Sequence, residues 1–148
     1  MIKSIITRSP EETIEAAKKI GKLLNSGDII AYTGGLGAGK TTFTRGLTLG
    51  IGLGDVVSSP TFALVNEYSA DKLTIYHFDM YRIDNELDLE SCGFFDYDFT
   101  NNVTVIEWSE NIKNFLPSDI IRITLNTIDE FTREIILKGD ERFAAAWD

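Results

Sequence analysis

The 148-residue sequence has a single cysteine, Cys92, a single histidine, His77, and three prolines. One cysteine excludes an internal disulfide and is typical of a reducing compartment. One histidine excludes a metal site built from several imidazoles. No apolar run approaches the roughly 20 residues that span a bilayer, and residues 1–12 lack the apolar core of a signal peptide. We therefore expect a soluble cytoplasmic protein that does not associate with a membrane.

Basic residues are also scarce, because 14 Lys and Arg stand against 23 Asp and Glu, for a formal net charge of −9. Proteins that grip nucleic acid through its phosphates are usually basic on at least one face. The sequence has no marked Lys/Arg cluster, which disfavours autonomous nucleic-acid binding. The acidic surface remains compatible with a basic protein partner, or with a role in solubility alone. The length and the 43% hydrophobic content suffice for one core, so we expect a single domain over residues 1–148.

What the chain does contain is an alternation of helical and strand-like patterns. Residues 9–27 predict a helix with Ser9 as N-cap, Pro10 in the first turn and Glu12 completing a capping box. An apolar run at 28–34 predicts a buried strand, and 40–50 a second helix. Further strands are expected at 62–68, 73–79, 103–108, 119–129 and 133–139, short helices at 84–93 and 109–116, loops at 50–62 and 94–102, and a helical turn or tail at 140–148. The pattern predicts an α/β fold with a mixed parallel and antiparallel sheet flanked by helices.

Between the first strand and the second helix stands TGGLGAGKTTF, residues 33–43. Gly34, Gly39, Lys40 and Thr41 match G-x-x-x-x-G-K-[ST], the Walker A motif of P-loop nucleotide-binding proteins. Glycines let the backbone amides approach phosphate oxygens, and a helix N-terminus adds unpaired N–H groups. Lys40 would reach the β- and γ-phosphates, and the Thr41 hydroxyl would ligate Mg²⁺. The predicted nucleotide contacts in this loop are Gly34, Gly35, Leu36, Gly37, Ala38, Gly39, Lys40, Thr41 and Thr42.

A nucleotide-bound Mg²⁺ needs further oxygen ligands, and hydrolysis needs a group that orients water. Two apolar runs end in a carboxylate, LTIYHFD in Asp79 and VTVIE in Glu107. Each resembles a Walker B pattern, although either alone fits a solvated acid at a strand end equally well. Together with Thr41 they predict one Mg²⁺–nucleotide site. The spacing leaves open which of the two lies closer to the metal.

Several other residues are candidates with an open choice of role. Thr61 in SSPTF lies where switch loops occur in related NTPases and is expected to sense the γ-phosphate and Mg²⁺, unless it only begins a strand. Trp108 after Glu107 either packs in the core or lies over the site, against nucleotide or partner. Arg45 and Arg82 either neutralise phosphate or form structural ion pairs. His77 is expected to be a hydrogen-bonded structural group.

The kind of NTPase can be narrowed by further absences. No Asn-Lys-x-Asp sequence is present, which disfavours guanine specificity, and the arginines are scattered rather than gathered in the lid typical of small-molecule kinases. ATP hydrolysis that drives or times another protein's work is therefore favoured. A small-molecule P-loop kinase and a non-catalytic nucleotide-sensing module remain as alternatives.

GGLGAGKTTFTRGL, SPTFALVNEY, HFDMYR and IEW, in this order and spacing, resemble the bacterial TsaE (YjeE) family, the ATPase components of tRNA threonylcarbamoyladenosine biosynthesis. The resemblance covers nearly the whole chain. It implies a compact P-loop fold and a weak ATPase that depends on the TsaB–TsaD pair, which modifies adenosine 37 of tRNAs reading ANN codons. The tRNA would be held chiefly by these partners, in line with the charge of −9, and the free protein is expected to be a monomer.

The resemblance also implies roles for individual residues. Lys40 would hold phosphates, Asp79 and Glu107 would serve Mg²⁺ and water activation, and Trp108 would lie near the nucleotide. The sequence departs from the family at Gly35, where an acidic residue is common. The backbone cradle does not need that side chain, so the departure affects only a charge-based contact.

Overall fold

The structure is a computed structural model of residues 1–148, and it describes all of them except residues 36, 55–56, 58–63 and 70–72. Its strands are β1 (Ile2–Thr7), β2 (Ile29–Thr33), β3 (Val65–Ser69), β4 (Thr74–Asp79), β5 (Val103–Glu107), β6 (Ile121–Thr127) and β7 (Arg133–Lys138). Its helices are α1 (Pro10–Gly21), α2 (Lys40–Ile51) and α3 (Glu86–Ser91), with 3₁₀ helices η1 (Phe94–Asp96), η2 (Ser109–Phe115) and η3 (Glu141–Phe143). None of the helices within these described ranges is long and apolar enough to cross a membrane.

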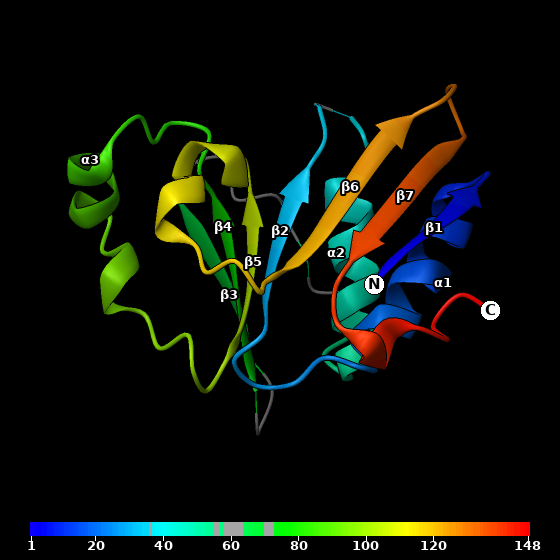
Figure 1. Ribbon diagram of the computed structural model, residues 1–148, viewed down its shortest axis with the longest axis horizontal. Helices are drawn as coiled ribbons and strands as arrows, with labels where there is room; N and C mark the ends of the chain where they lie inside the picture. The colour runs from blue at the N-terminus through cyan, green and yellow to red at the C-terminus, as the bar shows by residue number, and fades with distance from the viewer. Residues whose placement is uncertain (36, 55–56, 58–63, 70–72) are drawn as a thin grey trace.

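The strands form one seven-stranded sheet in the order β1-β7-β6-β2-β5-β4-β3 (Figure 1). β2 lies parallel to both β5 and β6, and β4 lies parallel to β5. The remaining pairs, β3 with β4, β6 with β7 and β1 with β7, are antiparallel. The prediction of a mixed sheet flanked by helices is confirmed.

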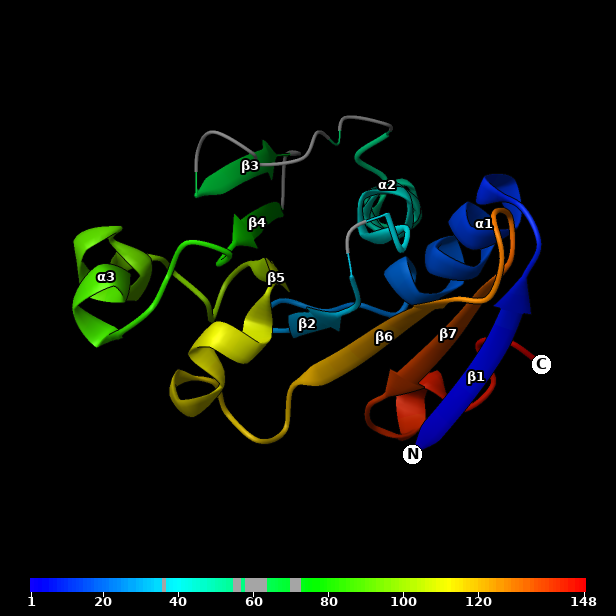
Figure 2. The ribbon, with the colours of Figure 1, turned by 90° about the horizontal axis from the view of Figure 1, so that it is seen from above.

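Helices α1 and α2 lie together on one face of the sheet (Figure 2). They approach closely because α2 presents a glycine: a Cβ on Gly46 would stand 2.4 Å from the Cβ of Ala17 and 2.5 Å from the carbonyl oxygen of Ile14. Phe43 and Leu47 of α2 are buried in the core formed with the sheet. This packing fixes α2, and with it the loop that precedes the helix.

A second hydrophobic cluster forms around β4, β5 and the segments that follow them. Phe78 is its centre, with ring centroids of Phe94 and Tyr97 at 5.2 and 5.0 Å. Met80, Leu89 and Ile106 are buried in the same cluster. The cluster anchors β4 and β5 from the side opposite to α2, because side chains alternate between the two faces of a strand.

Several expectations differ from the structure in their details. Residues 2–7 form an edge strand, β1, which was not predicted. The first helix ends at Gly21, before the expected stop at 27. The helix expected at 109–116 is the 3₁₀ helix η2 over Ser109–Phe115, with a kink at Ile112, and the loop expected at 94–102 begins with the 3₁₀ helix η1. The cap of α1 is confirmed in part: the Ser9 hydroxyl accepts from the Glu12 N–H at 3.1 Å, but the Glu12 carboxylate accepts from Arg8 N–H.

Candidate functional site

The glycine-rich loop connects the end of β2 to the start of α2, as the sequence predicts. Gly37 and Gly39 have φ values of 75° and 100°, in the left-handed region that side-chain-bearing residues rarely adopt. Gly39 is the N-cap of α2 and supplies no side-chain hydrogen bond to it. The first amides of α2 therefore lack a side-chain cap, and such N–H groups are donors suited to phosphate oxygens. Leu36, one of the predicted contacts, lies outside the described residues.

The side chain of Lys40 folds back over this loop. Its Nζ donates to the carbonyl oxygen of Gly34 at 3.1 Å and lies 4.0 Å from Oε1 of Glu107. The same ammonium lies over the Trp108 ring, 4.7 Å from its centroid. Lys40 is only 6% exposed. A buried cation is thus held at the loop by a carbonyl, a carboxylate and an aromatic face.

The space beside the loop is open where a phosphate chain requires room. A Cβ on Gly35 or Gly37 would meet no heavy atom within 4 Å. Together with the uncapped amides of α2 and the ammonium of Lys40, this space fits a polyphosphate. The same observation shows that packing does not require a glycine at position 35.

The two predicted carboxylates are neighbours at one edge of the sheet. Asp79 ends β4 and Glu107 ends β5, and the register of these parallel strands pairs them directly. Glu107 is 6% exposed and faces Lys40, whereas Asp79 is half-buried and accepts from the Tyr81 N–H at 2.9 Å. Of the two acids, Glu107 therefore lies in direct reach of the loop lysine.

Thr41 and Thr42 lie in the first turn of α2, directly after Lys40, and both are half-buried. Among the described residues, no group of three or more His, Cys, Asp or Glu side chains is arranged to hold a metal ion. Magnesium in nucleotide sites takes much of its coordination from phosphates and water, with one or two carboxylates. Thr41, Asp79 and Glu107 as Mg²⁺ ligands remain a prediction. Thr61, the predicted switch residue, lies outside the described residues.

Trp108 lies over the site rather than in the core alone. Its φ of 56° makes it the one described residue other than glycine with a left-handed backbone. Such a conformation costs about 1–3 kcal/mol and persists only where surrounding contacts impose it. Here the indole contacts both the Lys40 ammonium and the Tyr81 ring, whose centroid lies 5.0 Å away. Tyr81 is 62% exposed, so this aromatic pair forms an outer rim of the site.

A buried hydrogen-bond chain ties α2 to β2 behind the loop. The Thr44 hydroxyl donates to the Lys40 carbonyl and shares a 2.8 Å hydrogen bond with the Tyr32 hydroxyl. The carbonyl of Tyr32 in turn accepts from the Ser109 hydroxyl at 3.0 Å. Burial raises the pKa of the Tyr32 phenol far above its usual value, so the ring stays protonated. The chain fixes the first turn of α2 relative to the strand that precedes the loop.

Arg133, at the start of β7, contributes to the loop although the sequence gives no sign of it. Its Nε donates to the Ala38 carbonyl at 3.2 Å and its Nη2 to the Gly37 carbonyl at 3.1 Å. The same guanidinium donates to the Asp129 carbonyl at 2.7 Å. Arg133 therefore fastens the β6–β7 turn to the glycine loop. No motif marks it, because its partners are backbone groups distant in sequence.

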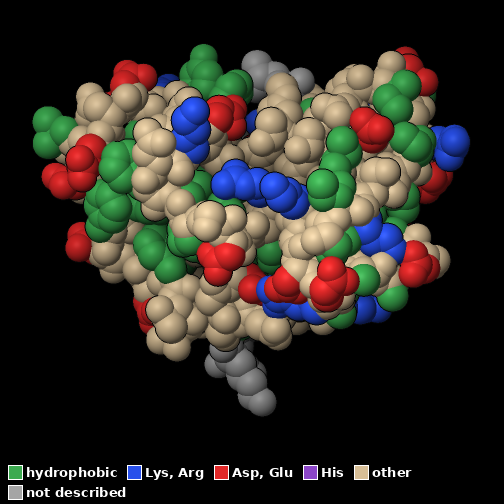
Figure 3. Space-filling view, viewed as in Figure 1, with side chains coloured by type: hydrophobic (Ala, Val, Ile, Leu, Met, Phe, Trp, Pro, Cys, Tyr) green, Lys and Arg blue, Asp and Glu red, His purple; other side chains and the backbone are tan. Residues whose placement is uncertain are grey.

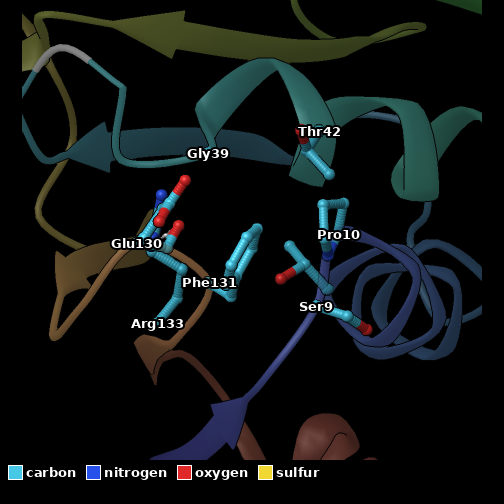
Figure 4. A pocket seen from close by; sticks show the side chains of 8 residues that line it. Ser9, Pro10, Gly39, Thr42, Glu130, Phe131 and Arg133 are labelled. Atoms are coloured by element: carbon cyan, nitrogen blue, oxygen red, sulfur yellow. Dashed lines mark hydrogen bonds between the residues drawn. The ribbon is translucent and has the colours of Figure 1, made fainter.

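A pocket adjoins the loop on the side of this turn (Figure 4). It lies between the N-terminus of α1, the first turn of α2 and the β6–β7 turn. Phe131 projects into the pocket and is 61% exposed. The residues that line the pocket are Ser9, Pro10, Thr13, Gly39, Thr42, Glu130, Phe131 and Arg133.

The surface charge agrees with the composition. Figure 3 shows Lys and Arg side chains interspersed with Asp and Glu over one face of the molecule. This pattern differs from the continuous basic surface that phosphate-backbone binding requires. It gives no support to nucleic-acid binding through that face.

Comparisons with known proteins give the family. The sequence profile described as "Threonylcarbamoyl adenosine biosynthesis protein TsaE" matches residues 7–135. The tRNA threonylcarbamoyladenosine biosynthesis protein TsaE of Bacillus subtilis is 38% identical over 129 residues, which cover 87% of this chain and 80% of that protein. The protein of the same name from Haemophilus influenzae is 44% identical over 110 residues, 74% of this chain and 70% of the relative.

A solved structure agrees with these relatives. The crystal structure of Bacillus subtilis YdiB matches this fold with a TM-score of 0.74 at 32% identity, covering 99% of this chain and 93% of YdiB. The likeness extends over nearly the whole chain, and the P-loop fold expected from the sequence is confirmed. The chain belongs to the TsaE family.

Proposed function

We propose that this chain is a Mg²⁺-dependent P-loop ATPase that supports threonylcarbamoyl transfer to adenosine 37 of tRNAs reading ANN codons, acting with a TsaB–TsaD complex. One observation carries the nucleotide assignment: the buried ammonium of Lys40 is held at a glycine loop next to the carboxylate of Glu107. The tRNA-modification assignment is supported by the relatives, which are named tRNA threonylcarbamoyladenosine biosynthesis proteins.

The loop and Lys40 would bind the phosphates of ATP. The ammonium, which donates to the Gly34 carbonyl in this structure, would instead donate to phosphate oxygens, and the flexible lysine chain allows this change. The Thr41 hydroxyl and the carboxylates of Asp79 and Glu107 would hold Mg²⁺, which when bound neutralises phosphate charge. Glu107, the acid nearer to Lys40, is the better placed of the two to orient the attacking water.

We propose that the nucleoside end of ATP would lie at the pocket beside the loop. It adjoins Gly39 and Thr42, the residues at the start of α2. Phe131 offers an exposed aromatic ring, and Pro10 an apolar surface, where a purine base can stack. The site would therefore extend from Glu107 across the glycine loop to the β6–β7 turn.

The partner assignment agrees with the charge of the chain. A net charge of −9 disfavours a direct grip on tRNA, so the tRNA would be bound through the TsaB–TsaD partners. We propose that the protein acts in the cytoplasm, is a monomer when free, and hydrolyses ATP weakly until its partners are present.

The test combines turnover and tRNA modification. Purified protein is assayed for phosphate release from ATP and Mg²⁺, with and without the TsaB–TsaD pair, and modified adenosine is measured in the tRNA. Lys40→Ala and Glu107→Gln should lower turnover about 100-fold or more, because each removes a charge aimed at the phosphates or water. Lys19→Ala, an exposed lysine on α1, is the matched control and should leave turnover unchanged.

Two results would contradict the proposal. Fast turnover that ignores the TsaB–TsaD pair would argue against partner dependence. Transfer of the γ-phosphate to a hydroxylated metabolite above the rate of transfer to water would indicate a kinase instead.

A further inference from the structure

His77, the single histidine of the sequence, is completely buried beside the proposed site. Both of its ring nitrogens have a partner. Nε2 lies 2.7 Å from Oε2 of Glu107, and Nδ1 lies 3.1 Å from the hydroxyl of Tyr68. None of the roles proposed for the nucleotide site involves this histidine.

The register of three neighbouring strands brings these side chains together. His77 in β4 is paired with Asn66 of β3 and Val105 of β5. Tyr68 follows Asn66 by two residues in β3, and Glu107 follows Val105 by two residues in β5. Both side chains therefore lie on the same face of the sheet as His77, because side chains alternate with a period of two. The chain Tyr68–His77–Glu107 thus crosses the sheet diagonally and ends at the loop lysine.

The donors and acceptors follow from the carboxylate. An ionised carboxylate only accepts, so Nε2 of His77 donates to Glu107. In the neutral ring Nδ1 is then the acceptor, and the Tyr68 hydroxyl donates to it. Oε2 of Glu107 is therefore occupied, while Oε1 points toward Lys40, 4.0 Å away.

We propose that His77, held by Tyr68, is a positioning residue that fixes the rotamer of Glu107 and leaves its Oε1 free for the loop. The proposal rests on the proposed ATPase function. A glutamate at the end of a strand has several rotatable bonds, and a single short hydrogen bond to a buried ring restricts them. Groups that hold a functional carboxylate in this way typically change activity or metal affinity by about 10–100-fold when removed.

The first test needs no nucleotide. Since His77 is the single histidine, the imidazole signals in an NMR spectrum of the ¹⁵N-labelled protein belong to it alone. In its neutral form the ring should show the Nε2–H tautomer in this spectrum. Glu107→Ala should shift the Nε2 resonance and Tyr68→Phe the Nδ1 resonance. An Nδ1–H tautomer, or a ring insensitive to Glu107→Ala, would overturn the proposal.

The second test separates positioning from a merely structural role. His77→Leu should lower kcat about 10–100-fold while the Kd for ATP changes less than about threefold. His77→Gln keeps a donor at the Nε2 position and should restore most of kcat. Tyr68→Phe removes one hydroxyl and should lower kcat a few-fold. Tyr76→Phe removes a hydroxyl from the opposite face of β4 and should leave kcat unchanged.

The outcomes distinguish the two proposals. A folded His77→Leu protein with wild-type kcat would refute the positioning role. If that variant does not fold, the role would be refuted by a wild-type kcat in Tyr68→Phe together with a lowered kcat in His77→Gln. Absence of turnover in the wild type with its partners would refute the ATPase function, while the nucleotide-free spectrum still decides whether His77 holds Glu107.

Discussion

Without nucleotide, Lys40 and Glu107 should stabilise one another, and a double-mutant cycle can measure this coupling. The two charges lie 4.0 Å apart, and both side chains are less than one-tenth exposed. Lys40→Met removes the ammonium and keeps an unbranched chain. Glu107→Gln removes the charge and keeps an oxygen that accepts from His77. The two changes together remove the attraction while disturbing little else.

Coulomb's law gives about 4 kcal/mol for unit charges at 4 Å and an effective dielectric constant of about 20. The net coupling is smaller, because each group keeps other partners in the single variants: Glu107 keeps His77, and Lys40 keeps the Gly34 carbonyl and the Trp108 ring. We expect a coupling free energy of about 1–3 kcal/mol, within the range of about 0.5–3 kcal/mol found for residues in contact.

The assay is urea unfolding of the wild type, both single variants and the double variant, without ATP or Mg²⁺, followed by circular dichroism. The double variant should be less destabilised than the sum of the single variants. Lys19→Met, on the exposed face of α1, combined with Glu107→Gln is the matched control and should be additive. Additivity of Lys40→Met and Glu107→Gln within about 0.5 kcal/mol would refute the reasoning.

Three further predictions concern other parts of the molecule. Gly46→Ala should destabilise the protein by about 1–3 kcal/mol, because its Cβ would stand 2.4 Å from that of Ala17; an unchanged urea midpoint would contradict the close packing of α1 on α2. Phe131→Ala should raise the Kd for ATP about tenfold, measured by calorimetry, and equal affinity would remove the pocket from the site. Hydrogen bonds from the Phe131 N–H and from Thr132 lower the pKa of the Asp129 carboxyl. That stabilisation is present above the unfolded pKa of about 4 and lost as pH falls through the lower folded value, so the stability difference between wild type and Asp129→Asn should vanish in acid; a difference that persists there would contradict it.

The outcome of the sequence predictions follows the range of the interactions involved. Strand β2, the glycine loop and helix α2 were predicted closely, because the signals for them, such as Gly39 and Lys40, lie within a few residues of one another in the sequence. Strand β1 was missed, since it is an edge strand that exists only through pairing with β7 near the other end of the chain. An edge position is set by the partner strand and not by local preference.

The amino-acid sequence by itself determined the position of the glycine loop and the two candidate acids, because motif spacing and apolar lead-in runs are local. Only the tertiary structure decided that Glu107 faces Lys40, that His77 and Tyr68 hold this acid, and that Arg133 fastens the loop. These contacts join residues from different strands. The register of the sheet fixes them, and register is set when all the strands pack together.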